Sequence, residues 1–514
     1  MNWSELIHLV PIGVVLATAL VVVFLDLVLS HADRYAIPWI ALTGCILGIV
    51  ATFQTPAWRH AEWFLSSQSA DATRAGTLML GGAFCLDTFG LSIWLVACLA
   101  GALSILCSSQ PGDDSALSTG EYYGLTLLAV AGMMLLAISH DFLTLLLSLE
   151  IMSISTYILT GSNRDDLRSN EAALKYLVLG AFSTAFLLMG IAFYYGAFGS
   201  LSLSQDAAFE NLSATNLQEA QYRQLFVIIG MGFILVGALF KIGASPFHFW
   251  IPDVYEGAPT PTTGLMAVGV KAAAFAVLAR LTFETFGAVE FREMWTPLLR
   301  TLAVLTMAIG NILAIRQTNV KRMLAYSGIA HTGYLLLAFL ILPANNDSAM
   351  MTEHLKSVVF YLLIYGIMTI GAFGVISLVR EDGRALEDLD SYTGLAKEHP
   401  AIALCMSIFM LSLAGMPPLG GFIAKFLIFR GAILQDEFMA ATLGILTSVV
   451  SLYYYLRVMV AMYMSPSNAT DSADAVPAAR CRYNWPSNML IYAAGALTLA
   501  LGIFPGLIEA VLSL

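Results

Sequence analysis

Two apolar stretches of this chain are interrupted by proline near their middle: LFKIGASPFHFW at 239–250 and LSLAGMPPLGGFIAKFLIF at 411–429. The interruption falls at Pro246 in the first stretch and at Pro417 and Pro418 in the second. Proline lacks a backbone donor and clashes with the preceding turn, so a helix should break at each place. A proline can also simply kink a packed helix. Two breaks in comparable settings, however, favour an ion path between two related halves.

The rest of the chain is equally apolar. Of 514 residues, 58% are hydrophobic and 11% are charged, whereas soluble domains carry about 25% charged residues. A bilayer core of about 30 Å needs roughly twenty apolar residues per helix, and about fourteen runs approach that length. Alternating segments of the barrel type are absent. We predict an all-α integral membrane protein with spans near 7–29, 37–55, 80–108, 121–139, 141–160, 171–197, 224–247, 260–282, 297–315, 320–342, 355–379, 400–433, 438–463 and 487–512.

The sixth and eleventh spans align with each other. LKYLVLGAFSTAFLLMGIAF and LKSVVFYLLIYGIMTIGAFG match Lys175 with Lys356 and Gly190 with Gly371. The fifth and tenth spans align loosely, with Tyr157 against Tyr334, and the seventh and twelfth are the two that proline breaks. Units five helices apart have opposite membrane orientation, so the pattern predicts two inverted five-helix repeats, each with a proline-broken helix.

The predicted organisation is one polytopic membrane domain over 1–514. It divides into N-terminal helices at 1–110, a first repeat at 121–282, a second repeat at 297–463 and a C-terminal helix at 487–512. The N-terminus lacks the basic region of a signal peptide, so we expect a retained first helix. Placing both termini in the periplasm leaves eleven basic residues on the cytoplasmic side and eight outside, a weak preference for this orientation.

Composition and motifs exclude several classes of function. The net charge of -11 comes from loops, and no basic tract could hold a nucleic acid. The six cysteines are scattered without a CxxC pair, which argues against iron–sulfur, zinc and disulfide frameworks. No glycine-rich phosphate loop follows a strand-like run. We therefore expect no metal or cofactor site in this chain.

Lysines lie where lipid-facing residues would be expected. Of the seven lysines, four fall inside apolar spans: Lys175, Lys241, Lys271 and Lys425. A lysine at mid-bilayer costs about 2.5–3.5 kcal/mol on insertion scales, so it normally faces protein or water. Lysine can release its proton when desolvated, whereas arginine stays charged. The pattern favours a proton relay, although Lys175 lies near a helix start and can snorkel.

Three further residues complete the predicted relay. Glu150, in LLLSLEIMSISTYIL, is the carboxylate nearest the middle of an apolar span, and we expect it to pair with Lys241. His248 and His331 can accept and donate protons, but each could equally be a hydrogen-bonded core histidine. Asp87 lies near a span end and is expected at the interface.

These residues in their settings resemble the antiporter-like membrane subunits of respiratory complex I, the proton-translocating NADH–quinone oxidoreductase. The resemblance covers nearly the whole chain, and HFWIPDVYEGAPTP is its most specific segment. It implies that Glu150, Lys241, Lys271 and Lys425 carry the proton path and that Lys175 takes the place of the family's sixth-span lysine. It also implies a bacterial inner-membrane location. Partners would be other membrane subunits, with NADH, FMN, iron–sulfur clusters and quinone bound elsewhere in the complex.

Two other functions stay open. A subunit of a multi-subunit cation/proton antiporter would share the repeat and the lysines, but it would exchange ions without redox chemistry. A purely structural helical scaffold would tolerate replacement of Lys241 or Glu150 without loss of coupling. The buried charges make the scaffold the weakest of the three.

Overall fold

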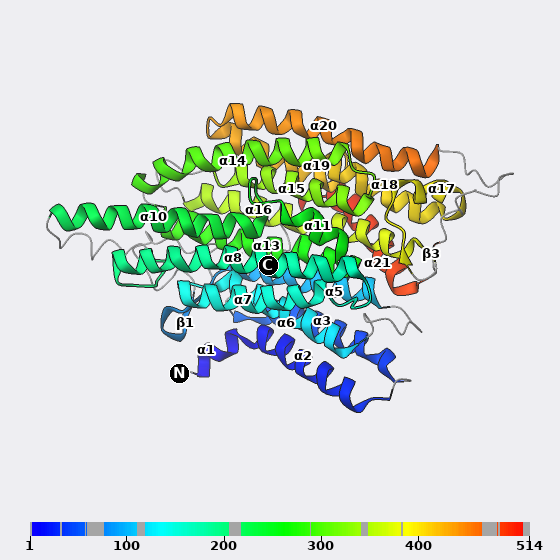
Figure 1. Cartoon of the computed structure of the whole chain (residues 1–514), viewed down its shortest axis with the longest axis horizontal. Helices are drawn as coiled ribbons and strands as arrows, with labels where there is room; N and C mark the ends of the chain where they lie inside the picture. The colour runs from blue at the N-terminus through cyan, green and yellow to red at the C-terminus, as the bar shows by residue number, and fades with distance from the viewer. Residues whose placement is uncertain are drawn as a thin grey trace.

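The computed structural model describes residues 3–30, 33–56, 58, 77–109, 119–204, 217–287, 289–340, 348–381, 384–464, 481 and 484–506. Within these residues the chain is almost entirely helical, which confirms the predicted all-α class. Twelve helices are long and apolar enough to cross a membrane. Most of them lie side by side with their axes close to one common direction, whereas α2 (Val10–Val28), α3 (Ile37–Gln54) and α21 (Trp485–Ile503) are tilted away from it (Figure 1).

The first part of the chain contains the N-terminal helices and the first predicted repeat. Its helices are α1 (Trp3–His8), α2 (Val10–Val28), α3 (Ile37–Gln54), α5 (Thr88–Ser108), α6 (Gly120–Ile138), α7 (Phe142–Thr160), α8 (Leu167–Phe198), α10 (Leu217–Ile242) and α11 (Trp250–Gly257). The eighth predicted span is one continuous rod made of α12 (Thr260–Leu265), η4 (Met266–Val270), α13 (Lys271–Ala279) and η5 (Arg280–Thr285).

The second part contains α14 (Val289–Ile315), α15 (Val320–Ala338), α16 (Ser348–Leu378), α17 (Leu395–Glu398), α18 (Pro400–Ala414), α19 (Gly420–Leu434), α20 (Phe438–Tyr463) and α21 (Trp485–Ile503). Helices thus occupy all fourteen predicted ranges. The twelve long apolar helices occupy twelve of them, α15 occupies one, and the α18–α19 pair occupies the last. The number of crossings stays a prediction. The end of the last range, 507–512, lies outside the described residues.

Two short antiparallel hairpins interrupt the helices. One pairs β1 (Thr77–Met79) with β2 (Phe84–Leu86), so the predicted span at 80–108 begins as a hairpin and becomes helical only at Thr88. The other pairs β3 (Arg380–Glu381) with β4 (Arg384–Ala385). Five helices between them, α5, α6, α7, α8 and α15, start at a side chain that satisfies a free backbone N–H, as Asp141 does for Thr144 at the start of α7.

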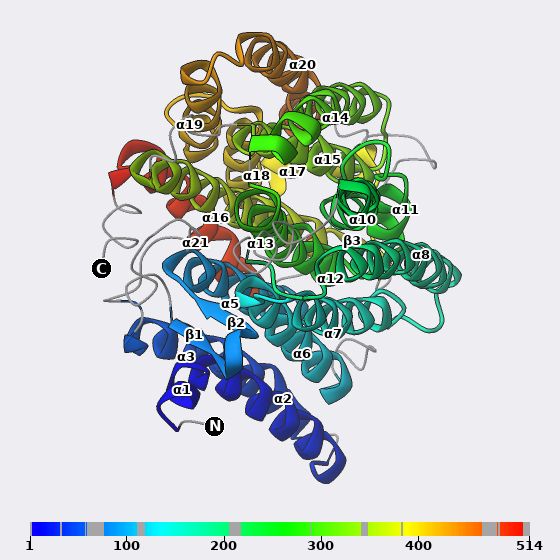
Figure 2. The same cartoon turned by 90° about the vertical axis from the view of Figure 1, so that its left-hand side faces the viewer.

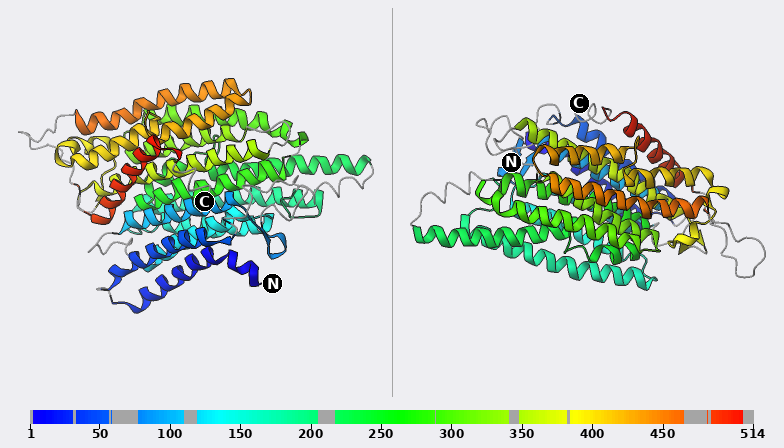
Figure 3. Two further views of the ribbon diagram at one scale, coloured as in Figure 1. Left: turned by 180° about the vertical axis from the view of Figure 1, so that it is seen from behind. Right: turned by 90° about the horizontal axis from the view of Figure 1, so that it is seen from above.

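The central rod is the core of the bundle. Every residue in the most apolar window of Thr260–Thr285 is buried, against 28% in α2. Viewed along the helices, α2 lies at one side of the molecule, α20 at the opposite side and α13 between them (Figure 2). The helix α21 runs obliquely across the back (Figure 3). Exposed leucine, valine and phenylalanine on α2, α8 and α20 are suited to lipid.

The aligned glycines occupy comparable places. A side chain at Gly190, on α8, would collide with the backbone of Ile234 on α10, so the two helices approach closely there. A side chain at Gly371, on α16, would collide with Phe409 on α18. In each half, the aligned glycine therefore lets a helix pack against the segment that leads into the proline break. This supports the repeats at 121–282 and 297–463, whose boundaries stay predictions.

Candidate proton-relay site

The first broken helix ends one residue after Lys241. α10 stops at Ile242, Gly243 takes a left-handed φ of 74°, and α11 starts only at Trp250. The Lys241 side chain is buried, and its Nζ donates to Ser153 Oγ at 2.8 Å and to Tyr157 Oη at 3.1 Å. Its hydrogen-bond partners are thus neutral hydroxyl groups, which can hold an ammonium or a neutral amine with little rearrangement.

Glu150 lies close to this site but does not touch Lys241. Its Oε1 accepts a hydrogen bond from Thr184 Oγ1 on α8 at 2.7 Å. Ser153, which does contact Lys241, follows three residues later on α7, about 4.5 Å along the helix axis. Among the described residues there is no ion pair between the glutamate and the lysine, so the expected direct pair is absent and Glu150 acts on Lys241 only through space.

Lys271 lies in the middle of the central rod. It directly follows the π-helical segment η4, a widened turn of the kind often found at functional sites. Its buried Nζ donates to the carbonyl oxygen of Gly328 at 2.7 Å and approaches Tyr365 Oη at 3.5 Å. The same nitrogen lies 5.0 Å from the centre of the Tyr365 ring. An ammonium is therefore held by one carbonyl and one aromatic face.

The second broken helix holds Lys425. α18 ends at Ala414, Gly415 takes a left-handed φ of 89°, and α19 starts at Gly420. The buried Nζ of Lys425 donates to the freed carbonyl of Ala414 at 3.0 Å and to Ser448 Oγ at 2.8 Å. The break thus supplies an acceptor that a continuous helix would have used itself.

His331 lies between the two lysines. Its Nδ1 is 2.7 Å from Tyr361 Oη, and its Nε2 is 3.3 Å from Tyr455 Oη. Its ring is 5.0 Å from the ring of Tyr365, which contacts Lys271, and 5.6 Å from the ring of Tyr334, over which Lys425 Nζ lies at 4.9 Å. Lys271 and Lys425 are therefore joined by a buried belt of tyrosines centred on one histidine.

The aligned tyrosines have matching roles. Tyr157 contacts Lys241 at the first break, and Tyr334 lies under Lys425 at the second. The two contacts differ in one respect, because the Tyr157 hydroxyl accepts from its lysine, whereas the Tyr334 hydroxyl accepts from Asn311. The alignment of the fifth and tenth spans thus identified residues that act on the two lysines.

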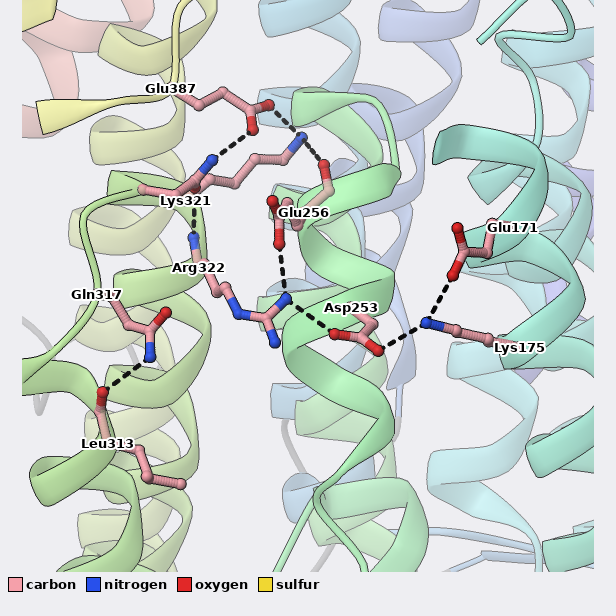
Figure 4. A network of polar contacts seen from close by, with 10 residues as sticks. Glu171, Lys175, Asp253, Glu256, Leu313, Gln317, Lys321, Arg322 and Glu387 are labelled. Atoms are coloured by element: carbon pink, nitrogen blue, oxygen red, sulfur yellow. Dashed lines mark hydrogen bonds and ion pairs between the residues drawn. The ribbon is translucent and has the colours of Figure 1, made fainter. Parts of the chain in front are cut away.

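Lys175 and His248 do not join these buried groups. Lys175 is 41% exposed and pairs with Glu171 and Asp253, each at 2.8 Å (Figure 4). His248 is half-buried in the first break, and its Nδ1 has no hydrogen-bond partner among the described residues. The seven residues from Lys241 to His248 do not form two helical turns with both side chains on one face, because the backbone leaves the helix after Ile242.

The network around Lys175 joins the two halves at one end of the bundle. Arg322, on α15, pairs with both Asp253 and Glu256 of α11 (Figure 4). Burial by itself raises the pKa of Asp253, but the hydrogen bonds from Lys175 and Arg322 outweigh this effect and leave the pKa below its ordinary value. Asp253 therefore stays ionised and links α8 to α15.

Sequence reasoning missed Lys321, which lies at the start of α15 and was not among the four lysines assigned to the interior of apolar spans. It is 2% exposed, and its Nζ donates to the carbonyls of Glu256 and Ala258 and to the carboxylate of Glu387. The two carbonyls belong to the end of α11, so Lys321 fixes the second half of the broken helix. The tyrosine belt was missed as well, since neutral tyrosines in an apolar span give no sequence signal.

Comparison with known proteins places these residues in context. Residues 139–451 match the model of the NADH:quinone oxidoreductase/Mrp antiporter transmembrane family. The chain is 44% identical to NADH-quinone oxidoreductase subunit N of Trichlorobacter lovleyi over 80% of its own length and 81% of the relative's. It superposes on a chain of respiratory complex I from Thermus thermophilus with a TM-score of 0.76 and 31% identity, covering 98% of this chain and 99% of that one.

A chain of the Mrp complex from Dietzia sp. DQ12-45-1b has the same fold. The TM-score is 0.75 at 20% identity, and the match covers 100% of this chain and 96% of the other. The fold alone is therefore shared by the two kinds of complex.

Proposed function

This chain belongs to the NADH:quinone oxidoreductase/Mrp antiporter membrane family, and we propose that it is the subunit N of a bacterial NADH–quinone oxidoreductase, where it moves protons through its buried lysines. It acts among other membrane subunits of the complex, in the inner membrane, with both termini in the periplasm. NADH, FMN, iron–sulfur clusters and quinone bind to partner subunits. The electrons therefore move elsewhere, and this chain supplies a proton path.

The observation that carries this proposal is the belt from Lys271 to Lys425 through His331. Each of the three side chains is buried, each can take or release a proton, and tyrosine hydroxyls or rings fill the intervals. Such groups are costly inside a membrane protein, so a purely structural scaffold gains nothing from placing three of them in line.

The relay begins at Lys241. A change of charge in a neighbouring subunit alters the field of Glu150, which lies one helical turn from the hydroxyl that holds Lys241. Lys241 then releases its proton toward Lys271, and His331 carries it to Lys425. Lys175 and His248 lie at the aqueous edge of this path. Moving one charge against 100 mV costs about 2.3 kcal/mol, and a hydrogen bond to a charged group contributes about 1.5–3 kcal/mol. The free energy of one or two hydrogen bonds at Lys241 is thus comparable with the cost of moving one charge.

The test uses the assembled complex in sealed vesicles, with NADH oxidation and proton uptake measured together. Lys241→Ala should assemble, and proton uptake per NADH should fall. Lys397→Ala, at an exposed lysine of α17, is the matched control. Unchanged proton uptake per NADH in Lys241→Ala would exclude this lysine from the path. Cation exchange that persists without NADH would favour the antiporter instead.

A further inference from the structure

Four ionisable side chains form a buried cluster outside the relay. Arg280 donates from one terminal nitrogen to Asp87 Oδ1 at 3.1 Å and from the other to Glu284 Oε1 at 2.8 Å. His140 Nδ1 lies 3.4 Å from Glu284 Oε2. Each residue is at most 4% exposed. Asp87 lies at the end of a span, as expected, where it begins α5 by accepting from the Gly90 N–H, and its side chain is fully buried in the protein.

The cluster lies at the end of the bundle opposite α11. The central rod starts next to α11 and runs to η5, which carries Arg280 and Glu284. His140 lies between α6 and α7, where its backbone N–H donates to Ala83 and the flanking Ser139 pairs with Phe84 of the first hairpin. The hairpin therefore closes the cluster at this end, with buried Cys85 beside it.

The charges of the cluster do not balance. One guanidinium faces two carboxylates, which leaves one negative charge in excess when His140 is neutral. Glu284 Oε2 and His140 Nδ1 have no hydrogen-bond partner among the described residues, although they face each other. One proton placed between them neutralises the excess charge and supplies the missing hydrogen bond, and buried carboxylates normally obtain both.

A small cavity lies beside Lys241, on the side of the cluster, although none of the four cluster residues lines it. It has a volume of about 10 Å³, close to the space that one water requires. Lys241 lines it, together with Leu136 and Val277. Leu136 adjoins Ala137, whose carbonyl accepts from Arg280 Nε, and Val277 lies one turn before Arg280. The cavity thus lies between the relay lysine of the first half and the cluster.

We propose that the cluster formed by Asp87, His140, Arg280 and Glu284 is a proton-binding site that exchanges one proton with Lys241 across this cavity. An N–H bond of the Lys241 ammonium breaks, and the proton is bound between Glu284 Oε2 and His140 Nδ1. The cluster then changes from one net negative charge to neutral, while Lys241 becomes a neutral amine. The reverse transfer reprotonates Lys241. Ser153, which holds Lys241, lies thirteen residues after His140, about 20 Å along the direction of α7, so the transfer needs a file of waters. The apolar lining of the cavity interrupts the path until these waters enter.

A purely structural ion cluster would tie α5, the α6–α7 turn and η5 together, and it would work best with balanced charges. Replacing Glu284 by glutamine provides that balance, since Arg280 then faces Asp87 alone and the amide can still hydrogen-bond both neighbours. The structural role therefore predicts normal assembly and normal pumping in Glu284→Gln. The proton-binding role predicts normal assembly without pumping, because an amide cannot take the proton.

The decisive experiment compares three variants of the complete complex in sealed vesicles. Glu284→Gln and Lys241→Ala should lose the same share of proton uptake per NADH. Glu437→Gln is the matched control, because Glu437 pairs one-to-one with Arg300 at the same end of the bundle, and it should keep wild-type uptake. His140→Asn tests the other partner and should resemble Glu284→Gln.

Each outcome decides between the two roles. The inference rests on the proposed function. The Lys241→Ala variant distinguishes a failure of the inference from a failure of the proposed function. Loss of uptake in Lys241→Ala but not in Glu284→Gln or His140→Asn would overturn the proton-binding cluster alone. Unchanged uptake in all three variants would reject the relay itself. Failure of both Glu284→Gln and His140→Asn to assemble would assign the cluster to stability and overturn the inference.

Discussion

The carboxylate of Glu150 is hydrogen-bonded at 2.7 Å to the hydroxyl of Thr184 on the adjacent helix. The acidic group expected to pair with Lys241 is therefore held by α8, while Lys241 is held by neutral hydroxyls. Because Glu150 does not contact Lys241, a change on the opposite face of α8 can act on the carboxylate without first breaking a contact with the lysine. The influence that we propose for Glu150 on Lys241 is therefore a field effect and not a bond.

A field effect depends on the charge of Glu150 more than on its hydrogen bond. Glu150→Gln removes the charge and with it the whole field, whereas Thr184→Val leaves the carboxylate in place and removes one hydrogen bond to a charged group, which contributes about 1.5–3 kcal/mol. We therefore expect Glu150→Gln to lower NADH-driven proton uptake more strongly than Thr184→Val. Thr184→Ser, which keeps the donor, should equal wild type. Equal losses in Glu150→Gln and Thr184→Val would contradict a field effect.

The two aligned tyrosines offer a matched pair of variants. Tyr157→Phe removes a hydroxyl that accepts from Lys241, and a bond to a charged group contributes about 1.5–3 kcal/mol. The protonated lysine should lose about tenfold or more in stability, since 1.4 kcal/mol is a factor of ten, and proton uptake should slow. Tyr334→Phe keeps the ring that faces Lys425 and loses only its bond to Asn311.

The measurement is the initial rate of proton uptake in vesicles, normalised to NADH oxidation. Tyr157→Phe should be the slower of the two variants. A larger loss in Tyr334→Phe would show that the second half depends on its hydroxyl, and that the two lysines are not held as the structure indicates.

The parts of this structure that the sequence could predict depend on local physics. Proline lacks a backbone donor whatever surrounds it, so both breaks were visible in the sequence, although α14 continues through Pro297 and shows that not every proline ends a helix. A lysine inside an apolar run is costly wherever the helix packs, so Lys241, Lys271 and Lys425 stood out. The structure places all three in the protein interior.

The parts that could not be predicted depend on how helices meet. Glu150 contacts Thr184 because of the rotation of α7 against α8, which hydropathy does not encode. Lys321 is buried because its acceptors come from α11 and from Glu387, far away in the sequence. Asp87 and His140 meet Arg280 for the same reason. One signal was available, since Arg280 and Glu284 are four residues apart near the end of an apolar span, a spacing that favours an ion pair on a helix.

Gly415 provides the backbone conformation of the second break beside Lys425. Its φ of 89° is a left-handed conformation, and a side chain there would lie 3.0 Å from Lys425 Cδ. A non-glycine residue in this conformation costs about 1–2 kcal/mol. We expect Gly415→Ala to lower the thermal midpoint of the complex and to reduce proton uptake, because the ammonium is displaced from Ala414. Gly232→Ala on α10, where a side chain meets open space, should change neither. Wild-type uptake in Gly415→Ala would show that Lys425 tolerates the shift.

Lys321 and Lys175 lie at the same end of the bundle but should differ in what they support. Removing buried Lys321 leaves two carbonyls at the end of α11 and the partly buried carboxylate of Glu387, which is 17% exposed, without their donor. Breaking a fully buried pair costs about 3–5 kcal/mol, and this loss should approach the lower end of that range. Lys175 is 41% exposed, and surface pairs contribute about 0–1 kcal/mol. Lys321→Ala should therefore reduce the amount of assembled complex, which native gel electrophoresis of the membranes measures, whereas Lys175→Ala should not.

Proton uptake by the complex that does assemble distinguishes a structural role from a role in proton transfer. The Lys321→Ala complex that does assemble should keep proton uptake per NADH close to wild type, because Lys321 holds α11 and is not part of the relay. Lys175→Ala should lower uptake less than Lys241→Ala, since the Lys175 side chain is 41% exposed and lies outside the group of buried lysines. A Lys175→Ala complex that assembles fully but pumps no better than Lys241→Ala would move the start of the proton path to the ion network around Asp253.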